Sequence, residues 1–94
     1  MIIERAEISL KEGSEGAFAG AMKSRGSALL AAAAGCHSVK VGRGVESPSK
    51  FILVLEWDSV EAHISFTKTP GYAAFIELIG AFVESVDMQH FDIG

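Results

Sequence analysis

The feature that most constrains this chain is a run of five apolar residues, Phe51-Ile52-Leu53-Val54-Leu55. A run of this composition is typical of a β-strand buried on both faces, because a strand with one exposed face alternates apolar and polar residues. We expect the strand to extend from Phe51 to Trp57. Other parts of the fold, or a partner, must therefore cover both of its sides.

The chain before this run predicts a strand, a helix and a second strand. Residues 2–10 alternate between two faces, which indicates a half-buried strand. Apolar residues at helical spacing predict a helix that is capped by Ser14 and ends at Gly35. Alternating valines over 36–45, followed by a turn at 46–50, predict a hairpin with the apolar strand. In the first strand the apolar face holds Ile2, Ala6, Ile8 and Leu10, and the polar face holds Arg5, Glu7 and Ser9.

The chain after the apolar run predicts a helix in two parts and a last strand. Asp58 or Ser59 is expected to cap a short helix over 60–67, which Pro70 and Gly71 end. A longer helix is predicted over 72–83 and an alternating strand over 86–93. The apolar face of the longer helix consists of Tyr72, Phe75, Ile76, Ile79, Phe82 and Val83.

This order of elements, β-α-β-β-α-β in a single domain over residues 1–94, predicts an α+β, ferredoxin-like fold. In that fold the helices cover one face of a four-stranded antiparallel sheet and leave the other face open. The strand over 51–57 is nevertheless apolar on both sides. Because an open apolar face favours association, the pattern predicts a homodimer whose sheets pack face to face.

Composition and charge argue against several classes of function. The net charge is −4 without a long basic run, which argues against nucleic-acid binding. The apolar runs are far shorter than the ~20 residues of a membrane span, and residues 1–5 lack a signal-peptide pattern. The single cysteine, Cys36, is expected to be a small buried side chain without a disulfide. We therefore expect a cytoplasmic protein.

Several segments together carry a family resemblance. They are the first strand and turn ending at Gly13, Phe18, residues 56–63 (Glu-Trp-Asp-Ser-Val-Glu-Ala-His), residues 69–75 and His90-Phe91. In these segments the chain resembles the antibiotic biosynthesis monooxygenase domain family, within the dimeric α/β-barrel group. The resemblance covers nearly the whole chain and implies a dimeric α/β barrel. Members of the family include cofactor-independent oxygenases that act on polyketide quinols, haem-degrading oxygenases and proteins of unknown role.

The resemblance does not extend to the haem-degrading branch, which has an asparagine on the first strand and a histidine on the long helix. Near those positions this chain has Ala6 or Glu7, and Ile76. The histidines also lack metal-ligand spacing along the chain, and no glycine-rich phosphate loop follows a strand. We therefore expect no cofactor and no metal.

His63 is the candidate catalytic residue, because histidine readily moves protons near neutral pH. In an oxygenase without a cofactor it could remove a phenolic or quinol proton, so that the substrate anion can reduce oxygen. Alternatively, His63 could only tie the short helix to the sheet. The candidate substrate-binding residues are Trp57, Phe66, Tyr72 and His90, each of which could equally be structural.

Two functions remain open. The chain is either a monooxygenase-like enzyme acting on a small aromatic or quinol-type compound in a pocket between sheet and helices, or a non-catalytic homodimer. The non-catalytic protein would bind a small apolar molecule or have a stress-related role. The enzyme requires His63 to face a cavity with room for a ring and a second polar group, whereas a filled core favours the alternative.

Overall fold

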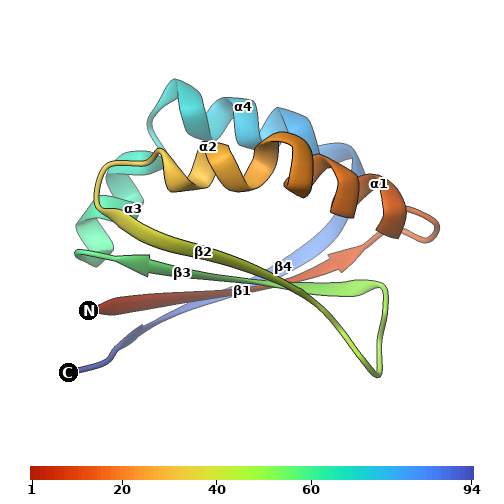
Figure 1. The fold of residues 1–94 in the computed structure, drawn as a ribbon, viewed down its shortest axis with the longest axis horizontal. Helices are drawn as coiled ribbons and strands as arrows, with labels where there is room; N and C mark the ends of the chain where they lie inside the picture. Colours follow the sequence, from red (N-terminus) through yellow and green to blue (C-terminus); the bar gives the residue numbers. More distant parts are fainter.

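A layer of helices lies on one face of a four-stranded sheet in the computed structural model, which describes residues 1–94 (Figure 1). The strands are β1 Ile2–Leu10, β2 Cys36–Arg43, β3 Lys50–Trp57 and β4 Val83–Asp92. Their order across the sheet is β2-β3-β1-β4, and each neighbouring pair is antiparallel. This topology confirms the expected α+β, ferredoxin-like fold.

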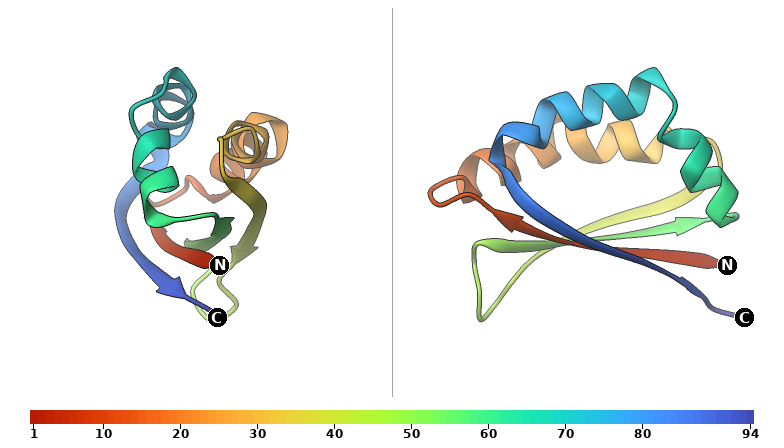
Figure 2. Two further views of the ribbon diagram at one scale, coloured as in Figure 1. Left: turned by 90° about the vertical axis from the view of Figure 1, so that its left-hand side faces the viewer. Right: turned by 180° about the vertical axis from the view of Figure 1, so that it is seen from behind.

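The helices lie on one face of the sheet. The first rod consists of α1 (Glu15–Ala21), a π-helical segment (Met22–Gly26) and α2 (Ser27–Ala31). The second helical segment consists of α3 (Val60–Phe66), α4 (Pro70–Ile79) and a 3₁₀ turn (Gly80–Phe82), with α3 inclined to α4 at the end of the sheet (Figure 2). No helix lies beneath the sheet (Figure 2). No helix has both the length and the apolar character needed to cross a membrane.

The ends of several elements differ from those expected. The first rod ends at Ala31 rather than at Gly35, which instead adopts a φ of +84° in the turn to β2. Ser14 occupies the N-cap position of α1, but its side chain makes no capping hydrogen bond. Pro70 begins α4, and β4 begins three residues early, at Val83, because the short 3₁₀ turn replaces the expected last turn of helix. Ser59 caps α3, as one of the two expected residues.

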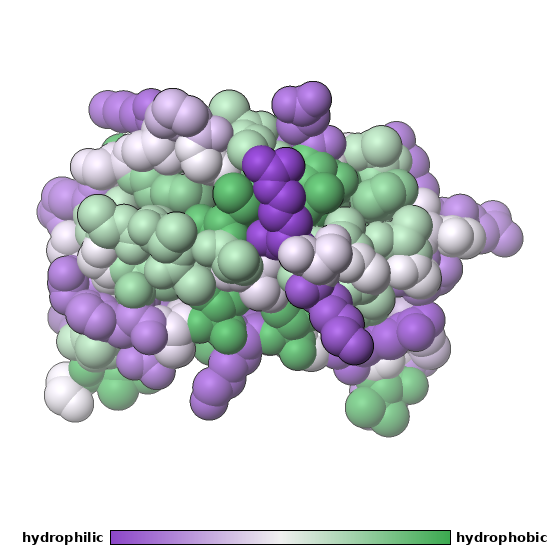
Figure 3. All heavy atoms as spheres, turned by 45° about the horizontal axis from the view of Figure 1, so that its top comes forward, coloured by the Kyte–Doolittle hydropathy of each residue, from purple (hydrophilic) through white to green (hydrophobic).

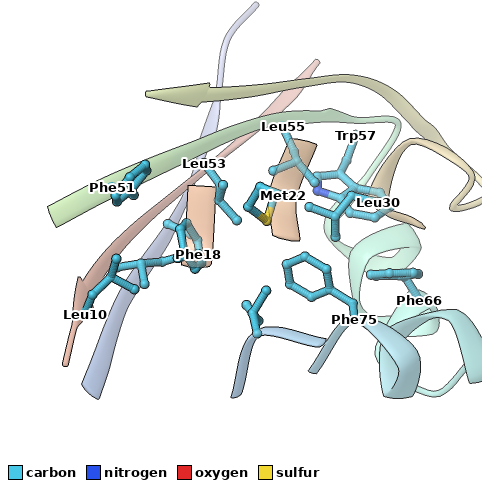
Figure 4. Close-up of a cluster of buried hydrophobic side chains, with 13 residues drawn as sticks. Leu10, Phe18, Met22, Leu30, Phe51, Leu53, Leu55, Trp57, Phe66 and Phe75 are labelled. Carbon is cyan, nitrogen blue, oxygen red and sulfur yellow. The ribbon is translucent and has the colours of Figure 1, made fainter. Parts of the chain in front are cut away.

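The apolar run divides its side chains between the two faces of the sheet. Phe51, Leu53, Leu55 and Trp57 are buried and face the helices, while Ile52 and Val54 are only half-buried on the opposite face. Phe18 and Met22 from the first rod and Phe75 from α4 pack toward the buried set, as Figure 4 shows. This chain therefore buries one face of β3 in its own core and leaves the other face half-buried, rather than burying both faces itself.

The uncovered face of the sheet combines apolar and paired charged side chains. Strand register places Ile52 and Val54 of β3 beside Glu7 and Arg5 of β1. Arg5 pairs with Glu7 on its own strand and with Asp87 of β4 at 3.6 Å. Because Arg5 has carboxylate partners on this face, its charge is compatible with an apolar partner surface around it.

Candidate functional site

A cavity of about 190 Å³ lies between the sheet and the helices. Strands β1, β3 and β4 form its floor, and α2, α3 and α4 form its walls and roof. Ile76, Val86 and Met88 line the cavity and are also 43–50% exposed, so it reaches the surface between α4 and β4. Apolar side chains also cover much of the helical surface, interrupted by hydrophilic ones (Figure 3).

The cavity has one polar end. All of its lining residues are apolar or aromatic except Glu4, from β1, and His63, from α3. Glu4 is only 4% exposed, and Trp57 Nε1 donates a hydrogen bond to its Oε1 at 2.9 Å. An isolated buried carboxylate is strongly disfavoured, so the hydrogen bond from Trp57 helps to stabilise Glu4 in its buried position.

Two histidines converge on the Glu4 carboxylate. His63 Nδ1 lies 2.9 Å from Glu4 Oε1, and His90 Nε2 lies 3.8 Å from the same oxygen. The contact between His63 and Glu4 is short but does not have the geometry of a hydrogen bond. His63 Nδ1 and His90 Nε2 are therefore both buried without a hydrogen-bond partner. The two rings also contact each other, with centroids 4.6 Å apart. Buried polar atoms without a partner are rare in folded proteins, so these two nitrogens need a further partner.

The fold brings the five candidate residues of the sequence together. Their rings form a continuous series of neighbours, in which consecutive centroids lie 4.6–5.8 Å apart. Trp57, His63, Phe66 and Tyr72 line the cavity, whereas His90 lies beside its polar end without lining it. Trp57 is fully buried and Phe66 nearly so, which makes both part of the core as well as of the cavity wall. The series runs in the order Tyr72, Phe66, Trp57, His63, His90.

Glu4 is the site residue that sequence reasoning missed. It lies on β1 between Ile2 and Ala6, on the face that points to the helices. The available signal was the alternation of the strand, which places Glu4 on the same face as the apolar side chains. Charged residues are almost never fully buried unless they are paired, so a carboxylate on that face could have been identified as a site residue.

Two other candidate groups lie outside the cavity. His37, at the start of β2, is half-exposed and contacts the Asp58 carboxylate. Cys36 is a partly buried free thiol, and burial raises its pKa, which opposes the reactive thiolate form. Neither residue lines the cavity, so Glu4, His63 and His90 are the ionisable side chains at its polar end.

The family assignment follows from a comparison of the sequence with protein-family models. The model described as antibiotic biosynthesis monooxygenase matches residues 1–78. The chain belongs to this family. The matched region contains Glu4, Trp57 and His63 and ends within α4, so His90 on β4 lies beyond it. No protein of curated function matches the sequence.

Solved structures of similar proteins share the whole fold. A protein from Bordetella bronchiseptica, provisionally described as an antibiotic biosynthesis monooxygenase, is 28% identical, with a TM-score of 0.90 over 99% of this chain and 96% of that one. SnoaB, a cofactor-independent oxygenase from Streptomyces nogalater solved as a single-site variant, is 14% identical, with a TM-score of 0.82 over 98% of this chain and 91% of its own. At that identity, the similarity to SnoaB shows a common fold.

Proposed function

We propose that this chain is a cofactor-independent monooxygenase that acts on a small aromatic or quinol-type compound. The observation that carries the proposal is the cavity, whose apolar walls end at a carboxylate and a histidine. Apolar walls with a few convergent polar groups are the usual form of a small-molecule site. The family membership and the fold shared with SnoaB support the same reaction class. We place the activity in the cytoplasm, because a lone free thiol fits a reducing compartment.

In the proposed reaction His63 removes a proton from the substrate. With an anthrone-type substrate, the resulting anion passes electrons to O₂ and a C–O bond forms at its methylene carbon. The O–O bond then breaks, that carbon becomes a carbonyl, and its two hydrogens leave with the second oxygen atom as water. The protonated imidazole would lie 2.9 Å from the Glu4 carboxylate, which stabilises the positive charge that forms. Glu4 is thus the second polar group that the enzyme requires.

The size of the cavity limits the substrate to one or two rings. A cavity of about 150 Å³ accepts benzene, and larger drug-sized ligands occupy roughly 300 Å³ or more. Oxygen uptake with one-, two- and three-ring quinols or anthrones tests both the function and this limit. We expect kcat/KM to fall about tenfold or more from two rings to three, because overfilling a packed site costs roughly 1–3 kcal/mol.

A widened cavity should relax this limit. Ile76→Ala shortens a side chain of α4 that lines the cavity, and it is expected to raise activity on three-ring compounds. Ile64→Ala, at a comparably exposed position outside the cavity, is the matched control. Equal turnover of two- and three-ring compounds by the parent protein would contradict the size limit. No oxygen uptake with any of them would instead favour the non-catalytic binding protein.

We further propose that the functional unit is a homodimer formed through the uncovered face of the sheet. Ile52 and Val54 of β3 point away from the helices, and Phe91 of β4, on the same face, is 46% exposed. An apolar surface of this kind is typical of an interface. Sedimentation at micromolar concentration should give about twice the mass of one chain.

Val54→Lys is expected to weaken the dimer by roughly 100-fold or more, because an unpaired charge in an interface costs several kcal/mol. Its direct neighbours across the strands are Arg5 and Lys40, so the added charge lies opposite two like charges. Ile64→Lys, on the exposed side of α3, is the matched control and should leave the mass unchanged. A parent protein that sediments as a well-folded monomer would rule out the interface.

A further inference from the structure

The Glu4 carboxylate has no fixed cation beside it. The residue is 4% exposed, its only hydrogen bond comes from the neutral Trp57 indole, and its only ion-pair neighbours are His63 and His90. Buried charges in proteins are paired or coordinate metal ions. A bound cation would supply the missing positive charge.

The three side chains lie close enough together to bind one ion. Their ligand atoms all lie within 4.8 Å of one another, and the Glu4 oxygen is 2.9 Å from His63 Nδ1 and 3.8 Å from His90 Nε2. Ligand atoms about 2.0–2.2 Å from a tetrahedral zinc ion lie roughly 3.3–3.6 Å apart. The Glu4–His63 contact is shorter than this and the Glu4–His90 contact is longer, so all three side chains would have to move slightly to bind one ion.

The ring nitrogens that face Glu4 are free to bind an ion. His63 Nδ1 and His90 Nε2 are both buried and without a hydrogen-bond partner. Protein and water neighbours usually satisfy such atoms, and a coordinated metal ion satisfies them equally well. Two histidines from α3 and β4 and a carboxylate from β1 thus bring three potential ligand atoms within 4.8 Å of one another.

We propose that Glu4, His63 and His90 bind one divalent transition-metal ion per chain, with zinc as the reference ion. Two imidazole nitrogens and one carboxylate suit zinc, cobalt and ferrous iron rather than calcium or magnesium, which prefer oxygen ligands. The Trp57 indole would orient the Glu4 carboxylate from outside the ligand set, as such hydrogen bonds do in metal sites. Glu4 and His63 line the cavity, so the remaining coordination position faces a small-molecule site.

Metal binding and the proposed proton transfer exclude each other. A metal on Nδ1 of His63 leaves the ring proton on Nε2, so neither nitrogen has a free lone pair to act as a base. Zinc is therefore expected to slow oxygen uptake by the proposed enzyme. The metal site itself does not depend on that activity, because binding is measured without substrate.

Cobalt(II) titration of the untagged protein, followed by visible absorption, tests the site. We expect d–d bands that saturate at one ion per chain and disappear when zinc is added. His90→Ala and Glu4→Gln should each weaken binding by roughly 100-fold or more, since even partners outside the ligand set contribute 10- to 100-fold. His37→Ala removes the half-exposed histidine of the Asp58 pair and should bind cobalt as the parent does.

The outcomes separate this proposal from the proposed function. A parent protein without a saturable cobalt site, or His90→Ala binding as tightly as the parent, overturns the metal site and leaves the oxygenase untouched. Saturable binding that His37→Ala abolishes also overturns it, because the ion would then sit at Asp58. If Glu4→Gln fails to fold, His90→Ala still decides, because the His90 side chain is 21% exposed and lies on an edge strand.

Discussion

His63→Ala is expected to lower the rate of quinol oxidation by about 10²–10⁴-fold, the usual contribution of a general base. The fold should survive, because His63 Nδ1 has no hydrogen bond in the folded chain and its side chain is still 14% exposed. Oxygen consumption and thermal melting are measured on the same preparations. His37→Ala, which changes a half-exposed histidine outside the cavity, is the matched control and should retain the parent rate.

Added imidazole distinguishes a catalytic base from a structural role for His63. If the ring acts as a base, free imidazole should partly restore activity to His63→Ala, since the deletion leaves a space at the polar end of the cavity. A structural role for His63 predicts the reverse pattern: a loss of about 1–3 kcal/mol in stability, no rescue and no oxygen uptake by either protein. That pattern would remove the support for the oxygenase.

The fold was predictable because each of its strands has a distinct pattern. The unbroken apolar run over Phe51–Leu55 has the sequence of a central strand, and the alternation over residues 2–10 indicated a strand with one buried face. The ends of elements were less predictable. The first rod contains a π-helical segment at Met22–Gly26 that the sequence pattern did not indicate, and Phe18 and Met22 hold the rod against the core.

The site was only partly predictable because its key pairing is between distant parts of the chain. His63 and His90 are 27 positions apart, and only the register of β4 beside β1 places His90 opposite Glu4. Local spacing therefore showed no ligand set, although two of the three histidines meet in the fold. The roles proposed for these residues remain predictions that the substitutions above test.

Trp57 connects the stability of the fold to the polar end of the cavity. Its side chain projects from the end of β3, is fully buried, and contacts both His63 and Phe66 of α3. Its indole also makes the only hydrogen bond of the Glu4 carboxylate. Removing the ring would leave a void and also a buried carboxylate without a donor, and these two effects can be separated by two substitutions.

Trp57→Ala is expected to lower the free energy of unfolding by about 3–5 kcal/mol, the usual cost of a large aromatic deletion. For a domain of this size that corresponds to a fall in melting temperature of roughly 12–40 °C. Trp57→Phe keeps most of the ring but removes the N–H, so it should lose about 1–3 kcal/mol through the unpaired carboxylate. Val45→Ala, at an 88% exposed position, should change stability by less than about 0.5 kcal/mol. Urea unfolding of the four proteins measures all of these effects, and a Trp57→Ala protein as stable as Val45→Ala would show that the indole neither fills the core nor supports Glu4.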